Sequence, residues 1–208
     1  HTGLQQKSRD LLHDTGESGA IVAMNPKTGE ILSMVSYPDF NSQTVDKDQA
    51  AIVEQNQGAF YNRATQSLFP PGSTFKIVTA AALLESDVDQ NYKDTGEEAS
   101  GGHPIRNAGQ KVYGNVNLNS AFTYSVNTYF ANKAMAMGKD HFGSVAEKFM
   151  FNKKFDFDLN TKVSKFDYSK WDDQALASAG IGQGDVLATP LQMCMVTSAI
   201  ANDVNIMQ

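Results

Sequence analysis

The stretch FPPGSTFKIVTAAALL, residues 69–84, decides the fold of this chain. Two prolines and a glycine interrupt regular structure just before Ser73, and the residues after it are rich in alanine and leucine. Apolar side chains occur on several sides of a helix drawn through residues 74–84, which predicts a largely buried helix. Ser73 is therefore expected to open a core helix, where backbone N–H groups lack partners and can stabilise a developing oxyanion.

Ser73 and Lys76 form a Ser-x-x-Lys pair at helical spacing, which places both side chains on one face, one turn apart. A serine hydroxyl becomes a nucleophile when a base removes its proton, and a lysine is a base only when it is neutral. Burial and neighbouring positive charge, including the positive end of the helix, would lower the lysine pKa. The pair is therefore a candidate nucleophile and base.

The spacing alone is weak evidence, because a chain of this length contains on the order of one Ser-x-x-Lys by chance. The context strengthens it, since a lysine in a buried helix is costly unless it is paired or functional. The structural alternative makes Ser73 a helix cap and lets Lys76 extend to solvent.

A second motif, YSVN at residues 124–127, lies between two predicted helices. The Ser125 hydroxyl and the Asn127 amide are two residues apart, so in a turn both can point into one cleft. There they could pass a proton and hold a substrate amide. Serine and asparagine are also common in ordinary turns, and that alternative stays open for this motif taken alone.

The run GIGQG at residues 180–184 is dense in glycine but matches neither a dinucleotide fingerprint nor a phosphate loop. Gly182, Gln183 and Gly184 are expected to form a tight backbone passage beside a site or another element.

The remaining patterns predict a mixed chain of helices and short strands. Predicted helices cover residues 3–14, 118–124, 128–137, 140–150 and 190–202, and predicted strands cover residues 20–24 and 30–35. Residues 38–70 and 87–117 are expected to be loops, because they are mostly polar.

The composition excludes several classes of protein. With 208 residues, of which 41% are hydrophobic, the chain is long enough to bury the core of one globular domain. The net charge of −6 and the lack of a lysine and arginine stripe argue against a nucleic-acid partner. The four histidines lack metal-ligand spacing, and residues 156–167 depart from a calcium loop, so no metal or cofactor is expected.

Taken in order, several motifs resemble the signature of the penicillin-binding proteins. They are NRA at residues 62–64, FPPGSTFK at 69–76, YSVN at 124–127, GQG at 182–184 and TPLQM at 189–193. The hairpin that turns through NPKTGE, residues 25–30, is similar to the opening hairpin of their transpeptidase domain. The resemblance implies an α/β (α+β) fold in which an antiparallel sheet is covered by helices, as in the serine β-lactamases.

The resemblance also implies a peptidoglycan D,D-transpeptidase. Ser73 would attack the D-Ala-D-Ala end of a stem peptide, with Lys76 as general base. Ser125 would relay a proton to the departing D-alanine, Asn127 would hold the substrate amide, and residues 182–184 would contribute to substrate binding. A β-lactam would acylate the same serine and remain attached. The expected partners are the stem peptide, β-lactam antibiotics and the machinery of wall synthesis and division.

One motif of the family is missing from the expected place. A Lys-Thr-Gly should follow the helix that begins at TPLQM, but the chain ends at Gln208 before reaching it. The KTG at residues 27–29 precedes Ser73 and lies in the hairpin turn, so a structural role is expected for it. We interpret the 208 residues as a partial domain, from a parent protein anchored in the plasma membrane with this domain outside. Taken alone, this piece is expected to react slowly or not at all with β-lactams.

Two alternatives remain at this stage. A serine β-lactamase would share Ser-x-x-Lys but would need a base for deacylation, and no Glu-x-x-x-Asn arrangement follows residue 127. The second alternative is a non-catalytic or sensor-type penicillin-binding module, which the missing Lys-Thr-Gly favours more than the motifs that are present do. Residues 1–208 carry no glycosyltransferase-like module, so a monofunctional transpeptidase is expected.

Overall fold

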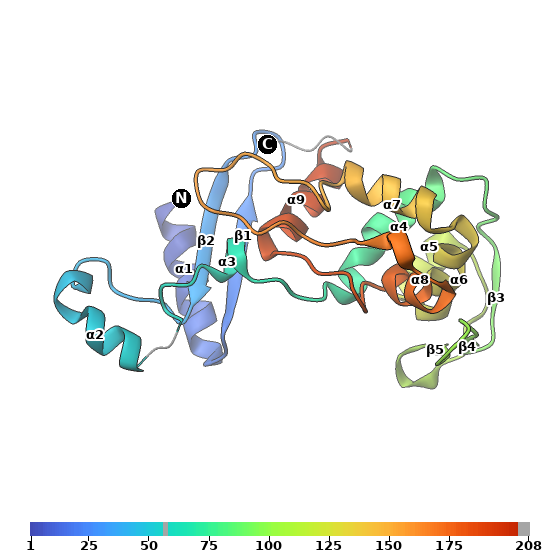
Figure 1. Ribbon diagram of the computed structural model, residues 1–208, viewed down its shortest axis with the longest axis horizontal. Coiled ribbons are helices and arrows are strands. Elements are labelled where there is room, and N and C mark those ends of the chain that lie inside the picture. The colour runs from blue at the N-terminus through green and yellow to red at the C-terminus, as the bar shows by residue number, and fades with distance from the viewer. Residues whose placement is uncertain (56–57, 204–208) are drawn as a thin grey trace. The chain divides into compact units, whose positions relative to one another are not determined.

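The computed structural model describes residues 1–55 and 58–203 (Figure 1). The chain forms two compact units. The first contains residues 1–69, 155–162 and those from Thr189 onward, and the second contains residues 70–154 and 163–188.

The first unit is built on an antiparallel hairpin of β1 (Gly19–Met24) and β2 (Ile31–Tyr37). Helix α1 (Thr2–Thr15) packs against β2, and α9 (Pro190–Ala201) packs against β1 (Figure 1). Gly29 takes a positive φ of 76° and donates its N–H to the Asn25 carbonyl, which closes the turn. Residues 27–29, the KTG that precedes Ser73, thus lie in the hairpin turn, as the sequence predicts.

The prediction of a loop over residues 38–70 is wrong in part, because this segment contains α2 (Val45–Gln55) and α3 (Arg63–Gln66). Most of the described residues of α2 are exposed, so the helix shows little of the apolar periodicity that reveals a packed helix. Helix α3 is a single turn, and the Asn62 side chain caps it by accepting a hydrogen bond from the Ala64 N–H at 3.0 Å.

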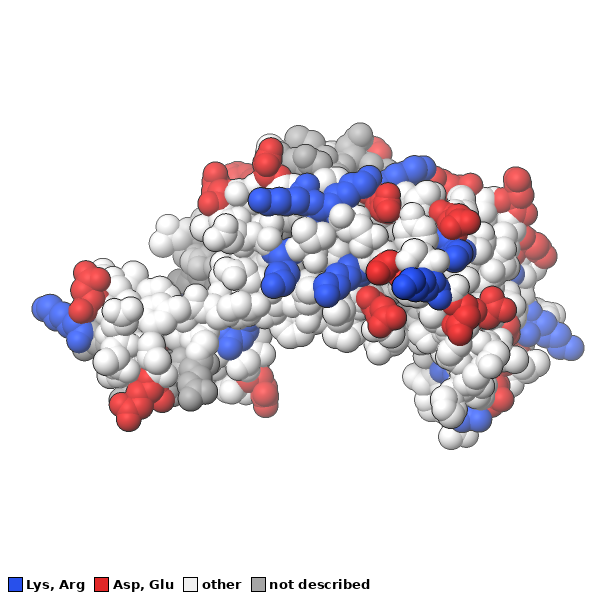
Figure 2. Space-filling model, in the orientation of Figure 1, with Lys and Arg blue, Asp and Glu red and all other residues white. Residues whose placement is uncertain are grey.

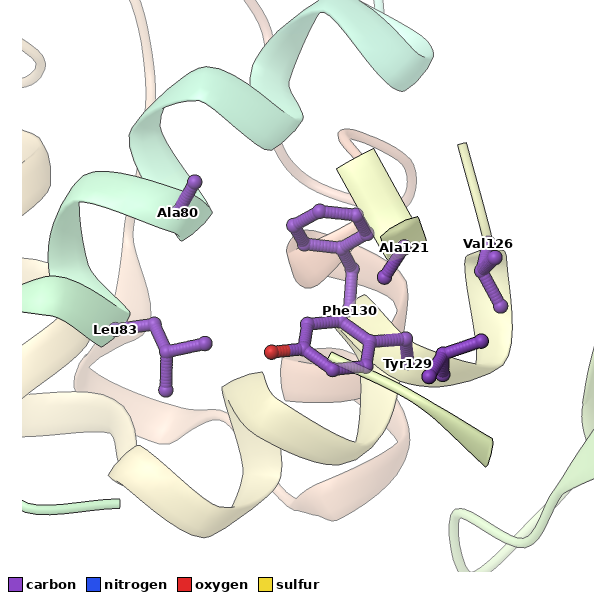
Figure 3. Packing of buried hydrophobic residues seen from close by; sticks show 7 residues of the cluster. Ala80, Leu83, Ala121, Val126, Tyr129 and Phe130 are labelled. Atoms are coloured by element: carbon purple, nitrogen blue, oxygen red, sulfur yellow. The ribbon is translucent and has the colours of Figure 1, made fainter. Parts of the chain in front are cut away.

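The second unit is helical, and its central helix is α6 (Asn127–Met137). Helices α4 (Lys76–Leu84) and α8 (Asp173–Gly180) both pack against it, while α7 (Lys139–Lys148) packs against α4 and α6. In the core shown in Figure 3, Ala80 and Leu83 of α4 face Tyr129 and Phe130 of α6. The cluster is completed by Ala121, from α5 (Leu118–Thr123), together with Val116 and Val126.

The helix predicted over residues 74–84 is confirmed, but its first turn is tighter than expected. Residues Gly72–Phe75 form the 3-10 turn η1, and the α-helix begins at Lys76. Phe75 is fully buried and stacks on Phe166 at 5.5 Å between ring centroids. This aromatic contact fixes the turn that carries Ser73.

The prediction of loops over residues 87–117 is also wrong in part. Strand β3 (Tyr92–Asp94) pairs with β6 (Gly114–Val116), and β4 (Glu97–Glu98) pairs with β5 (Ile105–Arg106), both antiparallel. A short 3-10 turn, η2 (Ala108–Gln110), lies between β5 and β6. Strands of two or three residues are too short for their alternating pattern to be recognised in a sequence.

We predict that Gly180→Ala destabilises the protein, although alanine normally favours a helix over glycine by about 1 kcal/mol. A Cβ on Gly180 would lie 2.6 Å from the Phe130 carbonyl oxygen and 2.7 Å from the Ala134 Cβ. Overpacking of this kind costs about 1–3 kcal/mol, so the free energy of unfolding should fall by roughly 1 kcal/mol or more. Unfolding by a chemical denaturant measures this change in the free energy of unfolding.

The matched control is Gly3→Ala, at an exposed position of helix α1, where the new Cβ meets only the His1 ring at 3.6 Å. This variant should be as stable as the unsubstituted protein or more so. A Gly180→Ala protein with unchanged or increased stability would show that the α6–α8 contact is looser than described.

Candidate active site

The 3-10 turn presents Ser73 at the surface and Lys76 in the interior. In a 3-10 helix, side chains three residues apart are eclipsed, so both lie on the same face of the turn. The Thr74 hydroxyl donates to the Pro71 carbonyl at 2.7 Å and holds the turn closed. Among the described residues, no hydrogen bond occupies the Ser73 hydroxyl, which is therefore free to meet a substrate.

Lys76 is only 2% exposed, which rules out the alternative in which it extends to solvent. Its Nζ donates to the Ser125 carbonyl at 2.8 Å, to the Ser125 Oγ at 2.9 Å and to the Asn127 Oδ1 at 2.6 Å. The Phe130 ring centroid lies 5.4 Å from the same nitrogen. Burial lowers the pKa of Lys76 to about 8, so its neutral form is accessible near physiological pH.

Ser125 lies in the turn that joins α5 to α6 and has a left-handed φ of 54°. For a residue with a side chain this conformation costs roughly 1–3 kcal/mol and is most often found at functional sites. The buried Val126 anchors the turn, and its N–H donates to the Ala121 carbonyl at 2.9 Å. The left-handed residue therefore directs both oxygens of Ser125 toward Lys76.

Asn127 begins α6, and hydrogen bonds fix the orientation of its amide. The Oδ1 accepts from Lys76, and the Nδ2 donates to the Arg106 carbonyl at 3.0 Å. One Nδ2 hydrogen and one Oδ1 lone pair remain for other partners. The two predicted motifs, Ser73 with Lys76 and Ser125 with Asn127, thus meet at one lysine nitrogen.

The glycine run passes directly beside the residue that precedes Ser73. The Gly72 N–H donates to the Gly182 carbonyl at 2.8 Å, and a Cβ on Gly182 would overlap the Gly72 carbonyl oxygen. Gly182 and Gly184 both take a φ of 69°, a conformation that favours glycine. Gln183, between them, is exposed. The structure therefore brings residues 182–184 next to the start of the turn that carries Ser73.

Three residues near this site could not be predicted from the sequence. Asp94, Asn107 and Thr128 are buried and hydrogen-bonded to one another beside the start of α6. Asp94 and Asn107 lie in a segment that reads as a polar loop, and nothing local shows that the fold buries them. Within the described ranges, no group of histidine, cysteine, aspartate and glutamate side chains is arranged to hold a metal ion.

On the face shown in Figure 2, positively and negatively charged side chains are interspersed. No helix in the described part of the chain is both long enough and apolar enough to cross a membrane.

An exposed serine one helical turn from a buried lysine, with a Ser-x-Asn turn bonded to that lysine, is the arrangement expected of a serine acyltransferase of the Ser-Lys type. The penicillin-binding protein transpeptidase domain matches residues 19–208, and the chain belongs to this family. This confirms both the resemblance seen in the motifs and the expected mixed fold with helix-covered antiparallel strands.

The similar proteins are named as peptidoglycan D,D-transpeptidases or as penicillin-binding proteins. The peptidoglycan D,D-transpeptidase MrdA of Acinetobacter baumannii is 35% identical over 96% of this chain and 32% of its own length. The D,D-transpeptidase domain of a peptidoglycan glycosyltransferase from Eggerthella lenta superposes with a TM-score of 0.86 at 36% identity, over 98% of this chain and 53% of that one. The ceftriaxone acyl-enzyme complex of penicillin-binding protein A from Mycobacterium tuberculosis superposes with a TM-score of 0.80 at 30% identity. This match covers 88% of this chain and 45% of that one.

The chain thus spans about a third of the length of the Acinetobacter baumannii protein and about half of the length of the two solved chains named above.

Proposed function

We propose that the protein carrying this chain is a peptidoglycan D,D-transpeptidase that crosslinks stem peptides through an acyl-enzyme on Ser73. The observation that carries the proposal is the buried Lys76 nitrogen, which lies one turn from Ser73 and is hydrogen-bonded to Ser125 and Asn127. The names of the similar proteins support the same activity over the β-lactamase and non-catalytic alternatives.

In the first half-reaction, the Ser73 oxygen bonds to the carbonyl carbon of the penultimate D-alanine while neutral Lys76 takes the hydroxyl proton. The C–N bond to the terminal D-alanine then breaks as that nitrogen receives a proton. The products are free D-alanine and an ester on Ser73. In the second half-reaction, an amine from a neighbouring stem peptide attacks the ester carbonyl and loses a proton to Lys76. The new C–N bond forms as the ester C–O bond breaks, and Lys76 returns the proton to the Ser73 oxygen.

The three acceptors around Lys76 suggest how the proton travels. The Ser125 carbonyl and the Asn127 Oδ1 can only accept hydrogen bonds, whereas the Ser125 hydroxyl can accept or donate. A neutral lysine would keep its two N–H groups on the two carbonyl oxygens and release the Ser125 hydroxyl, so its lone pair could turn to accept the Ser73 proton. Ser125 can therefore receive a proton from the protonated lysine and pass its own to the departing nitrogen.

A β-lactam enters the same scheme with one difference. Its amide lies in a ring, so the nitrogen released by Ser73 stays tethered and still occupies the space an acceptor amine needs. The expected product is a long-lived acyl-enzyme. We also propose that the domain acts outside the plasma membrane, where its substrate lies, in contact with the machinery of wall synthesis and division.

The test is acyl transfer by the full-length protein. A donor peptide ending in D-Ala-D-Ala, supplied with a D-amino acid as acceptor amine, should release D-alanine and yield a product in which the acceptor replaces it, detected by mass spectrometry. The Ser73→Ala protein is the control and should yield none. A stable acyl-enzyme that never transfers to the amine would favour a sensor, and hydrolysis without transfer would favour a hydrolase.

A further inference from the structure

Asp94 is a buried carboxylate that forms no ion pair among the described residues, yet it accepts four hydrogen bonds. It is 2% exposed. Its Oδ1 accepts from the Thr128 hydroxyl at 2.7 Å and the Gly96 N–H at 2.8 Å. Its Oδ2 accepts from the Tyr113 N–H at 2.7 Å and the Asn107 Nδ2 at 3.0 Å. A buried charge is costly unless its lone pairs are satisfied, and these donors satisfy them.

The four donors also keep Asp94 ionised. Burial by itself raises the pKa of this carboxyl, but the hydrogen bonds from Tyr113, Gly96, Thr128 and Asn107 outweigh it and hold the pKa below its ordinary value. Charged acceptors form stronger hydrogen bonds than neutral ones, so the cluster is rigid. Asp94 has no acceptor site left for a substrate, and any influence on the reaction passes through its partners.

Those partners adjoin the residues that hold Lys76. Thr128 follows Asn127, and its N–H donates to the Asn107 Oδ1 at 3.1 Å. Asn107 in turn follows Arg106, whose carbonyl accepts from the Asn127 Nδ2. Asp94 binds both Asn107 and Thr128, so it clamps together the two segments that set the orientation of the Asn127 amide.

A ring contact also connects Asp94, through its donor Tyr113, to the residue that precedes Ser125. The Tyr113 ring stacks on the Tyr124 ring at 5.6 Å between centroids and 22° between planes. Tyr124 directly precedes Ser125, whose left-handed backbone turns its oxygens toward Lys76. The Asp94 carboxylate thus supports both residues that bind the Lys76 nitrogen, Ser125 and Asn127, without contacting that nitrogen itself.

We propose that Asp94 is a positioning residue for acylation, holding Ser125 and Asn127 in contact with Lys76 through Thr128, Asn107 and Tyr113. This inference rests on the proposed function. Displacement of a catalytic group by about 1 Å can cost up to about 100-fold in rate, so loosening the cluster should slow the chemical step more than substrate binding.

Another contact ties the same segment to α6 farther from the site and supplies a control. The Asn132 Nδ2 donates to the Glu98 Oε1 at 2.9 Å. Within the segment, the Tyr92 hydroxyl donates to the Glu98 Oε2 at 2.6 Å. Asn132→Ala therefore weakens the attachment of the segment to α6 without changing the Asp94 cluster.

The experiment measures benzylpenicillin acylation of the full-length protein and its variants, separating the binding constant from the acylation rate constant across pH. Thr128→Val removes one hydrogen-bond donor at nearly constant shape, and Asp94→Asn leaves at least one of the four donors without an acceptor. Both should lower the acylation rate constant by about 10-fold to 100-fold. In both variants, the apparent pKa read from the pH profile of the acylation rate constant should move toward that of an ordinary lysine, because water then reaches Lys76.

The two control variants are Thr128→Ser and Asn132→Ala. Their acylation rate constants should stay within about twofold of that of the unsubstituted protein.

The proposal is overturned if Thr128→Val keeps the rate constant and pH profile of the unsubstituted protein, or if Asn132→Ala loses as much as Thr128→Val at equal thermal stability. If the Asp94→Asn protein does not fold, the acylation rate constant and pH profile of Thr128→Val alone decide whether the proposal holds. Acylation of the unsubstituted protein in the same series tests the proposed function separately, because its failure would appear before any variant is compared.

Discussion

The Ser73→Ala protein is expected to form no adduct with benzylpenicillin, whereas the unsubstituted full-length protein gains the mass of one penicilloyl group. The substitution removes the only oxygen that can form the ester in the proposed reaction. Because Ser73 is exposed and its hydroxyl has no hydrogen bond among the described residues, the fold should tolerate alanine, and the thermal unfolding temperature should not change. Intact-mass spectrometry measures the adduct.

The matched control is Ser144→Ala. Ser144 is exposed on a helix, and among the described residues its hydroxyl donates only to the His141 carbonyl of the same helix. This protein should acylate like the unsubstituted one. An adduct that persists in Ser73→Ala, mapped by peptide digestion to Ser125 or elsewhere, would contradict the assignment of the nucleophile.

The Lys76→Met protein is expected to acylate about 1,000-fold more slowly, since general-base catalysis contributes about 10²–10⁴ in rate. Methionine has a similar length and tolerates burial, so it fills the space that Lys76 occupies. It cannot take the Ser73 proton. Stopped-flow or quenched acylation at a fixed benzylpenicillin concentration measures the loss.

Lys133 offers a close comparison, because it is also buried, on α6, and its pKa is also lowered by burial. Its Nζ donates to the Asn91 carbonyl at 2.8 Å and not to any residue of the site. Lys133→Met should therefore destabilise the protein without slowing acylation of the folded fraction. Equal slowing in both variants would mean that Lys76 acts through the fold and not as a base.

The parts that the sequence predicts correctly are those encoded by neighbouring residues. The spacing of Ser73 and Lys76, the proline-glycine break before them and the hairpin turn at residues 25–30 all depend on contacts within a few positions. The helix that starts at Pro190 is likewise confirmed by the Thr189 cap, which accepts from the Gln192 N–H at 3.1 Å. Local chemistry of this kind needs no knowledge of the tertiary structure.

The parts that escaped prediction depend on residues far apart in the chain. The bond from Thr128 to Asp94 spans 34 positions, and the bond to Asn107 spans 21. Both partners lie in a segment whose strands are too short to recognise, so their burial cannot be read from hydrophobic periodicity. The contact that orients Asn127, through the Arg106 carbonyl, is hidden for the same reason.

Burial is proposed to make Lys76 the base for Ser73, and the pH dependence of Ser73 acylation is the most direct test of this role. Burial lowers the lysine pKa to about 8, so the neutral, active form is the minority below that pH and predominates above it. The acylation rate constant of the full-length protein should therefore rise about tenfold per pH unit below pH 8 and level off above it. A rate constant that is flat from about pH 6 to 9, or that rises until the ordinary lysine pKa near 10.4, would contradict the account.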